Sequence, residues 1–141
     1  MKTLKTDIII NAKPEKIWSV LTDFESYPDW NPFIRNISGI KKVGEQLNVQ
    51  IQQPGSKPMS FRPLVLHLDH NREFRWKGKF INRALFEGEH YFILNNNKNG
   101  TTTFIQGENF SGILVAFLGK MLEKTKSGFV LMNEALKKQC E

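Results

Sequence analysis

Six strand-like segments follow one another without an intervening helix, and this run constrains the fold of the chain more than any other feature. The segments cover about 33–42, 45–53, 59–69, 72–81, 85–95 and 101–111, separated by short turns rich in Gly, Pro, Asn and Asp. A parallel crossover needs a dozen or more residues, so connectors this short require neighbouring strands to pair antiparallel. The sequence therefore predicts an antiparallel sheet over the middle of the chain.

Helical patterns flank these strands on both sides. A first strand over 3–10 precedes a helix that begins near Pro14. The segment 23–32 contains two prolines and has room for only a short helix. Beyond Gly112, apolar residues recur at helical spacing out to Lys138, which predicts a closing helix of about 25 residues and roughly 37 Å.

Length and composition are those of one soluble domain. The chain has 141 residues, of which 40% are hydrophobic and 24% charged, so we expect a single domain over 1–141. No apolar run approaches the roughly 18 residues of a membrane span and no signal-like stretch opens the chain, which favours a cytoplasmic location. The single cysteine, Cys140, forms neither an internal disulfide nor a zinc cluster. We therefore expect no metal site and no cofactor.

The net charge of the chain is positive. Twenty Lys and Arg stand against fourteen Asp and Glu, which gives +6. This excess permits an anionic partner, but the basic residues are scattered and form no dense arm, so we expect a solvated basic surface and no nucleic-acid partner. Contact of this surface with a membrane or an acidic protein stays open as one hypothesis, and we expect a monomer or a weak homodimer.

Side-chain alternation separates two faces of the last three strands. The even-numbered residues are mostly aromatic or small, and they include Phe74, Trp76, Gly78, Phe80, Phe86, Gly88, His90, Phe92, Phe104, Gln106, Glu108 and Phe110. Pairing the hairpins about their turns places Trp76 opposite His90 and His90 opposite Gln106. On the odd face the same register sets Lys77 opposite Glu89, a pair of opposite charges that belongs in solvent. The even face is therefore predicted to be the inner one.

Three polar residues, His90, Gln106 and Glu108, interrupt the aromatic inner face beside Gly78 and Gly88. A buried carboxylate is costly unless it is paired, hydrogen-bonded or hydrated, so Glu108 needs a partner. One interpretation is that the two glycines leave room for a ligand that the polar groups orient. The other is that Gln106 and Glu108 reach solvent at a barrel mouth while His90 forms hydrogen bonds within the core.

The rings of the inner face and of the closing helix also have two interpretations. The sheet supplies Phe74, Trp76, Phe80, Phe92, Phe104 and Phe110, and the helix supplies Phe117, Met121 and Phe129. These side chains either wall a pocket around an apolar molecule or fill a core. Gly78 and Gly88 favour a cavity. If the segment 59–69 pairs in matching register with the next strand, Arg62 joins the row of Glu108.

Several short stretches, taken in order, suggest a known family. They are 12–18, 24–32, 88–92, 100–102, 107–112 and 133–137. With the order of the elements, they resemble the START-like superfamily, also called SRPBCC, and within it the polyketide cyclase/dehydrase and lipid-transport branch. The resemblance implies an α+β helix-grip fold. In this fold a curved seven-stranded antiparallel sheet wraps around the long C-terminal helix, and two short helices follow the first strand. It also implies a cavity for a hydrophobic ligand, with Trp30 near its entrance.

Three hypotheses for function follow. The first is binding or transport of a small hydrophobic ligand, such as a lipid, a quinone, a polyketide-like or an aromatic molecule, whose polar end is oriented by His90, Gln106 and Glu108. The second is a cyclase- or dehydratase-type enzyme in which Glu108 or His90 acts as general acid or base. The third is an interaction protein that uses the basic surface.

Overall fold

Eight strands and three α-helices make up the part of the chain that the computed structural model describes, which is residues 2–79, 86–112, 115 and 119–141. The strands are β1 (Lys2–Ile10), β2 (Ile34–Ser38), β3 (Asn48–Ile51), β4 (Met59–Phe61), β5 (Leu64–Asp69), β6 (Glu73–Lys79), β7 (Glu87–Asn96) and β8 (Thr102–Ser111). The helices are α1 (Pro14–Leu21), the short 3-10 helix η1 (Phe24–Ser26), α2 (Tyr27–Trp30) and α3 (Gly119–Cys140).

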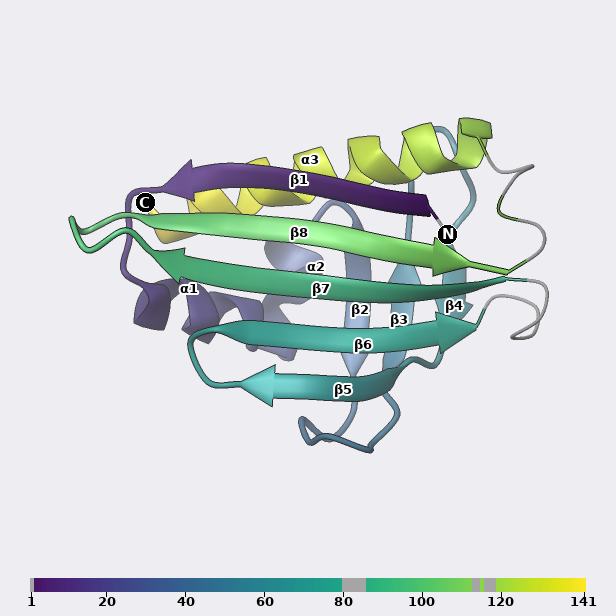
Figure 1. Ribbon diagram of the computed structural model, residues 1–141, viewed down its shortest axis with the longest axis horizontal. Coiled ribbons are helices and arrows are strands. Elements are labelled where there is room, and N and C mark those ends of the chain that lie inside the picture. Colours follow the sequence, from purple (N-terminus) through teal and green to yellow (C-terminus); the bar gives the residue numbers. More distant parts are fainter. Residues whose placement is uncertain (1, 80–85, 113–114, 116–118) are drawn as a thin grey trace.

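The strands form two antiparallel sheets. The larger has the order β1-β8-β7-β6-β5 and the smaller the order β2-β3-β4. In Figure 1 the smaller sheet and α3 both lie behind the larger sheet, and the strands of the smaller sheet run across those of the larger. The expected α+β helix-grip fold is therefore confirmed. The number of strands differs from the prediction, because eight strands in two sheets replace seven strands in one.

The helices after β1 form as the sequence predicts. Pro14 lies in the first turn of α1, where its missing N–H interrupts no helical hydrogen bond. Tyr27 of α2 is fully buried, and its hydroxyl donates a hydrogen bond to the backbone oxygen of Leu21. Burial raises the pKa of the Tyr27 phenol above its ordinary value, and the nearby Asp23 carboxylate raises it further. Tyr27 therefore anchors the short helices to the end of α1.

The prediction of one strand over 59–69 is wrong, because the chain changes sheets in the middle of this segment. β4 pairs with β3, whereas β5 pairs with β6. Pro63 lies between them and has no N–H to donate, which interrupts the regular strand ladder, although its backbone oxygen still accepts a hydrogen bond from the N–H of Leu47 at 2.9 Å. Arg62 is exposed at this crossover and does not join the row of Glu108.

The predicted register is right for one hairpin and two residues off for the next. Between β6 and β7, Trp76 lies opposite His90 as expected. Between β7 and β8, His90 lies opposite Glu108 and not opposite Gln106, because the turn is centred one residue later than expected, on Asn99. A shift of two residues keeps every side chain on its own face. The inner face therefore has the residues that alternation predicts.

Charged pairs mark the outer face of the larger sheet. Lys77 lies opposite Glu89, as the predicted register requires. The ion pairs themselves run diagonally, with Lys77 Nζ 3.1 Å from Glu87 Oε1 and Arg75 Nη1 3.4 Å from Glu89 Oε1. Ion pairs this exposed contribute little to the stability of the sheet. Their main value is that they identify its solvent-facing side.

Most of the predicted pocket rings belong to a packed core. Phe74, Trp76, Phe92, Phe104, Phe110 and Phe129 are each at most 2% exposed. The ring of Phe92 stacks on that of Phe104 at 6.0 Å between centroids and lies 5.9 Å from that of Phe74. The filled-core interpretation therefore holds for most of these rings. Phe80 and Phe117 lie outside the described residues.

The closing helix is described from Gly119 onward. α3 has 22 described residues, and most of the predicted first turn lies outside the described part of the chain. Cys140 at its end is buried, which raises the pKa of the thiol to about 11. None of the helices in the described ranges has both the length and the apolar character needed to cross a bilayer.

Gly128 allows α3 to pack directly against Phe33. A Cβ added at this glycine would lie 2.5 Å from Cδ1 and 2.8 Å from Cε1 of the Phe33 ring. Since that ring is itself buried, it would have to move to admit a methyl group. The absence of a side chain at this position therefore allows α3 to approach the chain just before β2 closely.

We expect Gly128→Ala to lower the free energy of unfolding by about 1–3 kcal/mol, because overpacking outweighs the better helix propensity of alanine. Gly119→Ala is the matched control, since no atom of the described residues lies within 4 Å of its added Cβ, and its stability should stay at or slightly above that of the wild type. Urea unfolding measures both. A Gly128→Ala variant as stable as the control would contradict this packing.

Candidate functional site

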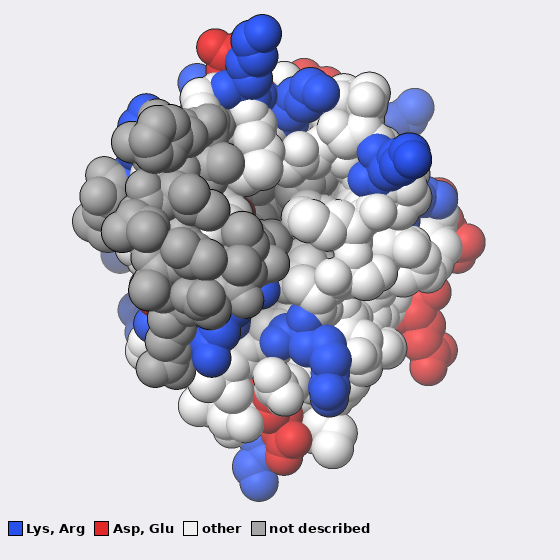
Figure 2. All heavy atoms as spheres, turned by 90° about the vertical axis from the view of Figure 1, so that its right-hand side faces the viewer, with Lys and Arg blue, Asp and Glu red and all other residues white. Residues whose placement is uncertain are grey.

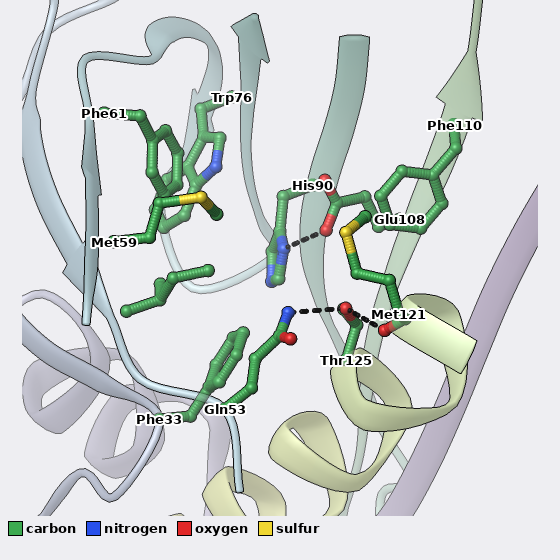
Figure 3. A pocket seen from close by; sticks show the side chains of 11 residues that line it. Phe33, Gln53, Met59, Phe61, Trp76, His90, Glu108, Phe110, Met121 and Thr125 are labelled. Carbon is green, nitrogen blue, oxygen red and sulfur yellow. Dashed lines mark hydrogen bonds and ion pairs between the residues drawn. The ribbon is translucent and has the colours of Figure 1, made fainter. Parts of the chain in front are cut away.

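A small pocket lies between the two sheets and the first turns of α3 (Figure 3). Its lining residues are Phe33, Ile51, Gln53, Met59, Phe61, Trp76, His90, Glu108, Phe110, Met121 and Thr125. The cavity volume is about 20 Å³, which leaves room for about one water molecule. The lining is mostly aromatic and methionine side chains, with a few polar groups, as in many small-molecule sites.

Five of the residues singled out from the sequence meet at this pocket. They are Trp76, His90, Glu108, Phe110 and Met121. Four come from the polar and aromatic inner face of β6, β7 and β8, and Met121 lies on α3 as expected. The prediction of a site between the larger sheet and the closing helix is therefore consistent with the place of the pocket.

Other predicted site residues lie behind the pocket or beside it. Phe74, Phe92, Phe104 and Phe129 belong to the core, and Gly88 is buried in β7. Gly78 leaves room for the Phe61 ring, because a Cβ at position 78 would lie 3.1 Å from Phe61 Cδ2. The space that the sequence assigned to a ligand is thus occupied at Gly78 by a ring from β4.

Arg62 and Trp30 lie away from the pocket lining. Arg62 borders a polar groove on the outer side of the smaller sheet. Trp30 is half-buried beside Tyr27, with 5.3 Å between ring centroids, and its Nε1–H is buried without a hydrogen-bond partner among the described residues. Phe117, which is predicted to line the pocket, lies outside the described residues.

His90 and Glu108 form a buried pair at the pocket wall. His90 is 3% exposed and Glu108 is 6% exposed, and Nδ1 of His90 lies 3.2 Å from Oε1 of Glu108. The imidazole ring stacks on Trp76, with 5.1 Å between centroids, and meets the edge of Phe129 at 4.8 Å. Figure 3 shows the Glu108 carboxyl between His90 and Phe110, at the edge of the cavity. The partner that Glu108 needs is therefore His90.

A chain of hydrogen bonds continues from this pair into α3. Nε2 of His90 lies 2.9 Å from Oε1 of Gln106, whose Nε2 donates to Oδ1 of Asn133 at 2.8 Å. Asn133 donates in turn to Oγ1 of Thr6 on β1 at 2.8 Å. All four side chains are buried, and the chain links three neighbouring strands of the larger sheet to α3.

Sequence reasoning missed the outer wall of the pocket. The missed lining residues are Phe33, Ile51, Gln53, Met59, Phe61 and Thr125. Gln53 donates to Thr125 Oγ1 at 2.6 Å and so ties the chain after β3 to α3. Thr125 lies four residues after Met121 and four before Phe129, so helical spacing places it on the same face of α3 as these two residues. Ile51 shares a face of β3 with buried Val49, which alternation also indicates.

Among the described residues, no three His, Cys, Asp or Glu side chains lie close enough together to hold a metal ion. The chemistry that the site can supply in its own right is therefore that of the His90–Glu108 pair. Such a pair can accept or transfer a proton and can hold the polar group of a ligand.

Comparison with protein families identifies the family of the chain. A family model described as polyketide cyclase / dehydrase and lipid transport matches residues 1–141. The chain belongs to this family. The match confirms the START-like resemblance that the sequence motifs indicate, over the whole length.

Solved structures show the same helix-grip fold. The Zhui aromatase/cyclase from Streptomyces sp. R1128 is 13% identical with a TM-score of 0.78, over 99% of this chain and 93% of that one. A START superfamily protein from Mycobacterium smegmatis is 19% identical with a TM-score of 0.74, over 98% and 96%. Norcoclaurine synthase from Thalictrum flavum, in complex with dopamine and hydroxybenzaldehyde, is 15% identical with a TM-score of 0.72, over 98% and 85%. No curated protein sequence matches the chain.

In this member of the polyketide cyclase / dehydrase and lipid transport family, we expect Asn133→Ala to lower the free energy of unfolding by about 2–3 kcal/mol. The substitution removes a partner from both Gln106 and Thr6 in a buried site. Asn36→Ala is the matched control, because its amide bonds Gln50 on the exposed surface, and its effect should stay within about 0.5 kcal/mol. Equal losses of unfolding free energy in Asn133→Ala and Asn36→Ala, measured by urea unfolding, would contradict a stabilising role for the buried hydrogen bonds.

Proposed function

We propose that this protein binds a small, mostly apolar molecule in the pocket between β4, β8 and α3. The observation that carries the proposal is the composition of the wall, where rings and methionines surround a few polar groups that include the buried pair His90 and Glu108. Burial of an apolar molecule against such a wall supplies affinity, and a few polar groups fix its orientation. The family description, which includes lipid transport, supports the same proposal.

The pocket must widen to admit such a molecule, since small-molecule sites commonly measure about 300–1,000 Å³. Met59 and Met121 border it, and Met59 is 39% exposed, so unbranched side chains stand where the pocket would open. Phe61 lines both the pocket and the polar outer groove, whose volume is about 540 Å³. Rotation of these three side chains would enlarge the site without moving a strand.

The surface beside the pocket suits entry of an apolar molecule. Figure 2 views the molecule from the side where β4 and the first turns of α3 lie in Figure 1. It shows a hollow near the middle of this face, with mostly uncharged side chains along one edge and Lys and Arg side chains at several places around it. We infer that a ligand enters from this end.

A ligand that carries a ring fits the wall best. Trp76 and Phe110 are aromatic lining residues on the larger sheet, Phe61 lines the pocket from the smaller sheet, and Phe33 lines it from the residue just before β2. Ring-bearing molecules gain from offset or edge contacts with such a wall beyond the burial of area. The norcoclaurine synthase structure, which has the same fold, holds dopamine and hydroxybenzaldehyde.

A cyclase- or dehydratase-type reaction is the second proposal, and the His90–Glu108 hydrogen bond favours it over other chemistry. General acid or base work requires a group within hydrogen-bond reach of the reacting atom. Both ring nitrogens of His90 already face oxygens of Gln106 and Glu108. The acid or base in such an enzyme would therefore be Glu108, with His90 as its partner.

Binding can be tested with N-phenyl-1-naphthylamine, a neutral aromatic probe whose fluorescence rises in apolar sites. We expect saturable binding to the wild type and at least about tenfold weaker binding to Met121→Trp, in which a larger ring fills the pocket. Val130→Trp is the matched control, because this position on α3 is 40% exposed, and it should bind as the wild type does. Thermal unfolding first establishes that both variants fold.

Two results would contradict the proposal. One is the absence of any fluorescence change with the wild type. The other is equal loss of binding in both tryptophan variants, or loss in Val130→Trp alone, which would move the site to the exposed apolar surface of α3 around Val130 and Leu131.

A further inference from the structure

The hydrogen-bond chain behind the pocket has a fixed direction. Thr6 Oγ1 donates to the backbone oxygen of Gln106 at 2.9 Å, because a carbonyl oxygen can only accept. Having used its one hydrogen, Thr6 Oγ1 accepts from Nδ2 of Asn133. The other amide atom of that side chain, Asn133 Oδ1, therefore accepts from Nε2 of Gln106.

This direction places a hydrogen on His90. The Nε2 of Gln106 faces Asn133 and also approaches the backbone oxygen of Phe129 at 3.4 Å, so the amide oxygen of Gln106 is the atom that faces His90. Since an amide oxygen only accepts, Nε2 of His90 carries a hydrogen. The other ring nitrogen, Nδ1, faces Oε1 of Glu108. Gln106 is thus a positioning residue for the pair at the pocket wall.

Glu108 then presents an acceptor to the pocket wherever the proton between Nδ1 and Oε1 lies. With the proton on Nδ1 of His90, Glu108 is a carboxylate and both of its oxygens accept. With the proton on Oε1, the second oxygen Oε2 is a carbonyl oxygen and also accepts. No described residue forms a hydrogen bond with Oε2. The pair therefore offers a ligand one acceptor and no donor.

We propose that the pocket selects neutral aromatic or otherwise apolar molecules that carry a hydroxyl group, whose O–H donates to Oε2 of Glu108. This inference rests on the proposed function and names its ligand class. Molecules that place a carboxylate or a phosphate beside Glu108 are disfavoured, because the oxygens of these groups only accept. The described residues that line the pocket also include no Lys or Arg to neutralise them.

Three probes with one ring system test this inference: naphthalene, 2-naphthol and 2-naphthoic acid. Near neutral pH the phenol is uncharged and the acid is an anion. We expect equilibrium dialysis against the full chain to show 2-naphthol binding at least about tenfold more tightly than naphthalene, which is the effect of one buried hydrogen bond. The anion of 2-naphthoic acid should bind more weakly than naphthalene.

Glu108→Gln connects the preference to its residue. The amide can donate as well as accept, so the ratio of 2-naphthol affinity to 2-naphthoate affinity should fall at least about tenfold. Glu89→Gln is the matched control, because it removes the same charge from the outer face of β7, where Glu89 pairs with Arg75. The ratio in this control should equal that of the wild type.

The outcomes separate the two proposals. If naphthalene binds but 2-naphthoate binds as tightly as 2-naphthol, or 2-naphthol gains nothing over naphthalene, the ligand class is wrong and the proposed function stands. If none of the three probes binds, both are wrong. The wild-type comparison decides among these results even where Glu108→Gln fails to fold.

Discussion

The buried amide of Gln106 is the contact on which the rest of the site depends. It lies on β8, faces His90 on β7 and bonds Asn133 on α3, and Asn133 bonds Thr6 on β1. A buried polar group left without a partner costs about 1–3 kcal/mol, so these side chains favour one position of the helix relative to the sheet. In that position Glu108 reaches the pocket wall with His90 as its partner.

Aromatic packing surrounds this polar chain and determines how much open space remains. Trp76 and Phe129 enclose the His90 ring, and further rings of the larger sheet stack on one another in the core. What remains is a cavity of about 20 Å³ against a wall in which Met59 and Met121 are the most adaptable side chains. The high phenylalanine content of the chain therefore serves mainly the core, and the pocket occupies its edge.

Alternation in the sequence could predict the inner face because parity survives a register error. His90 and Glu108 lie together on that face although the predicted pairing of β7 with β8 is two residues off. The place of Arg62 could not be predicted in this way, because the chain changes sheets beside it. The part of the pocket wall formed by Phe33 and Met59 also could not be predicted. It depends on how the two sheets cross, and no local sequence pattern indicates that arrangement. The family resemblance predicted the fold, whereas the partner of Glu108 is identified only by the structure.

The central claim is that a small apolar molecule lies in the pocket beside Glu108, and methionine methyl NMR tests it most directly. Met59 and Met121 line the pocket, whereas Met132 is fully buried in the core. With ¹³C-methyl methionine and 2-naphthol, the account predicts nuclear Overhauser effects from the naphthol ring to the methyl groups of Met59 and Met121, and none to Met132. Saturating 2-naphthol that gives no such effect at either pocket methionine would contradict it.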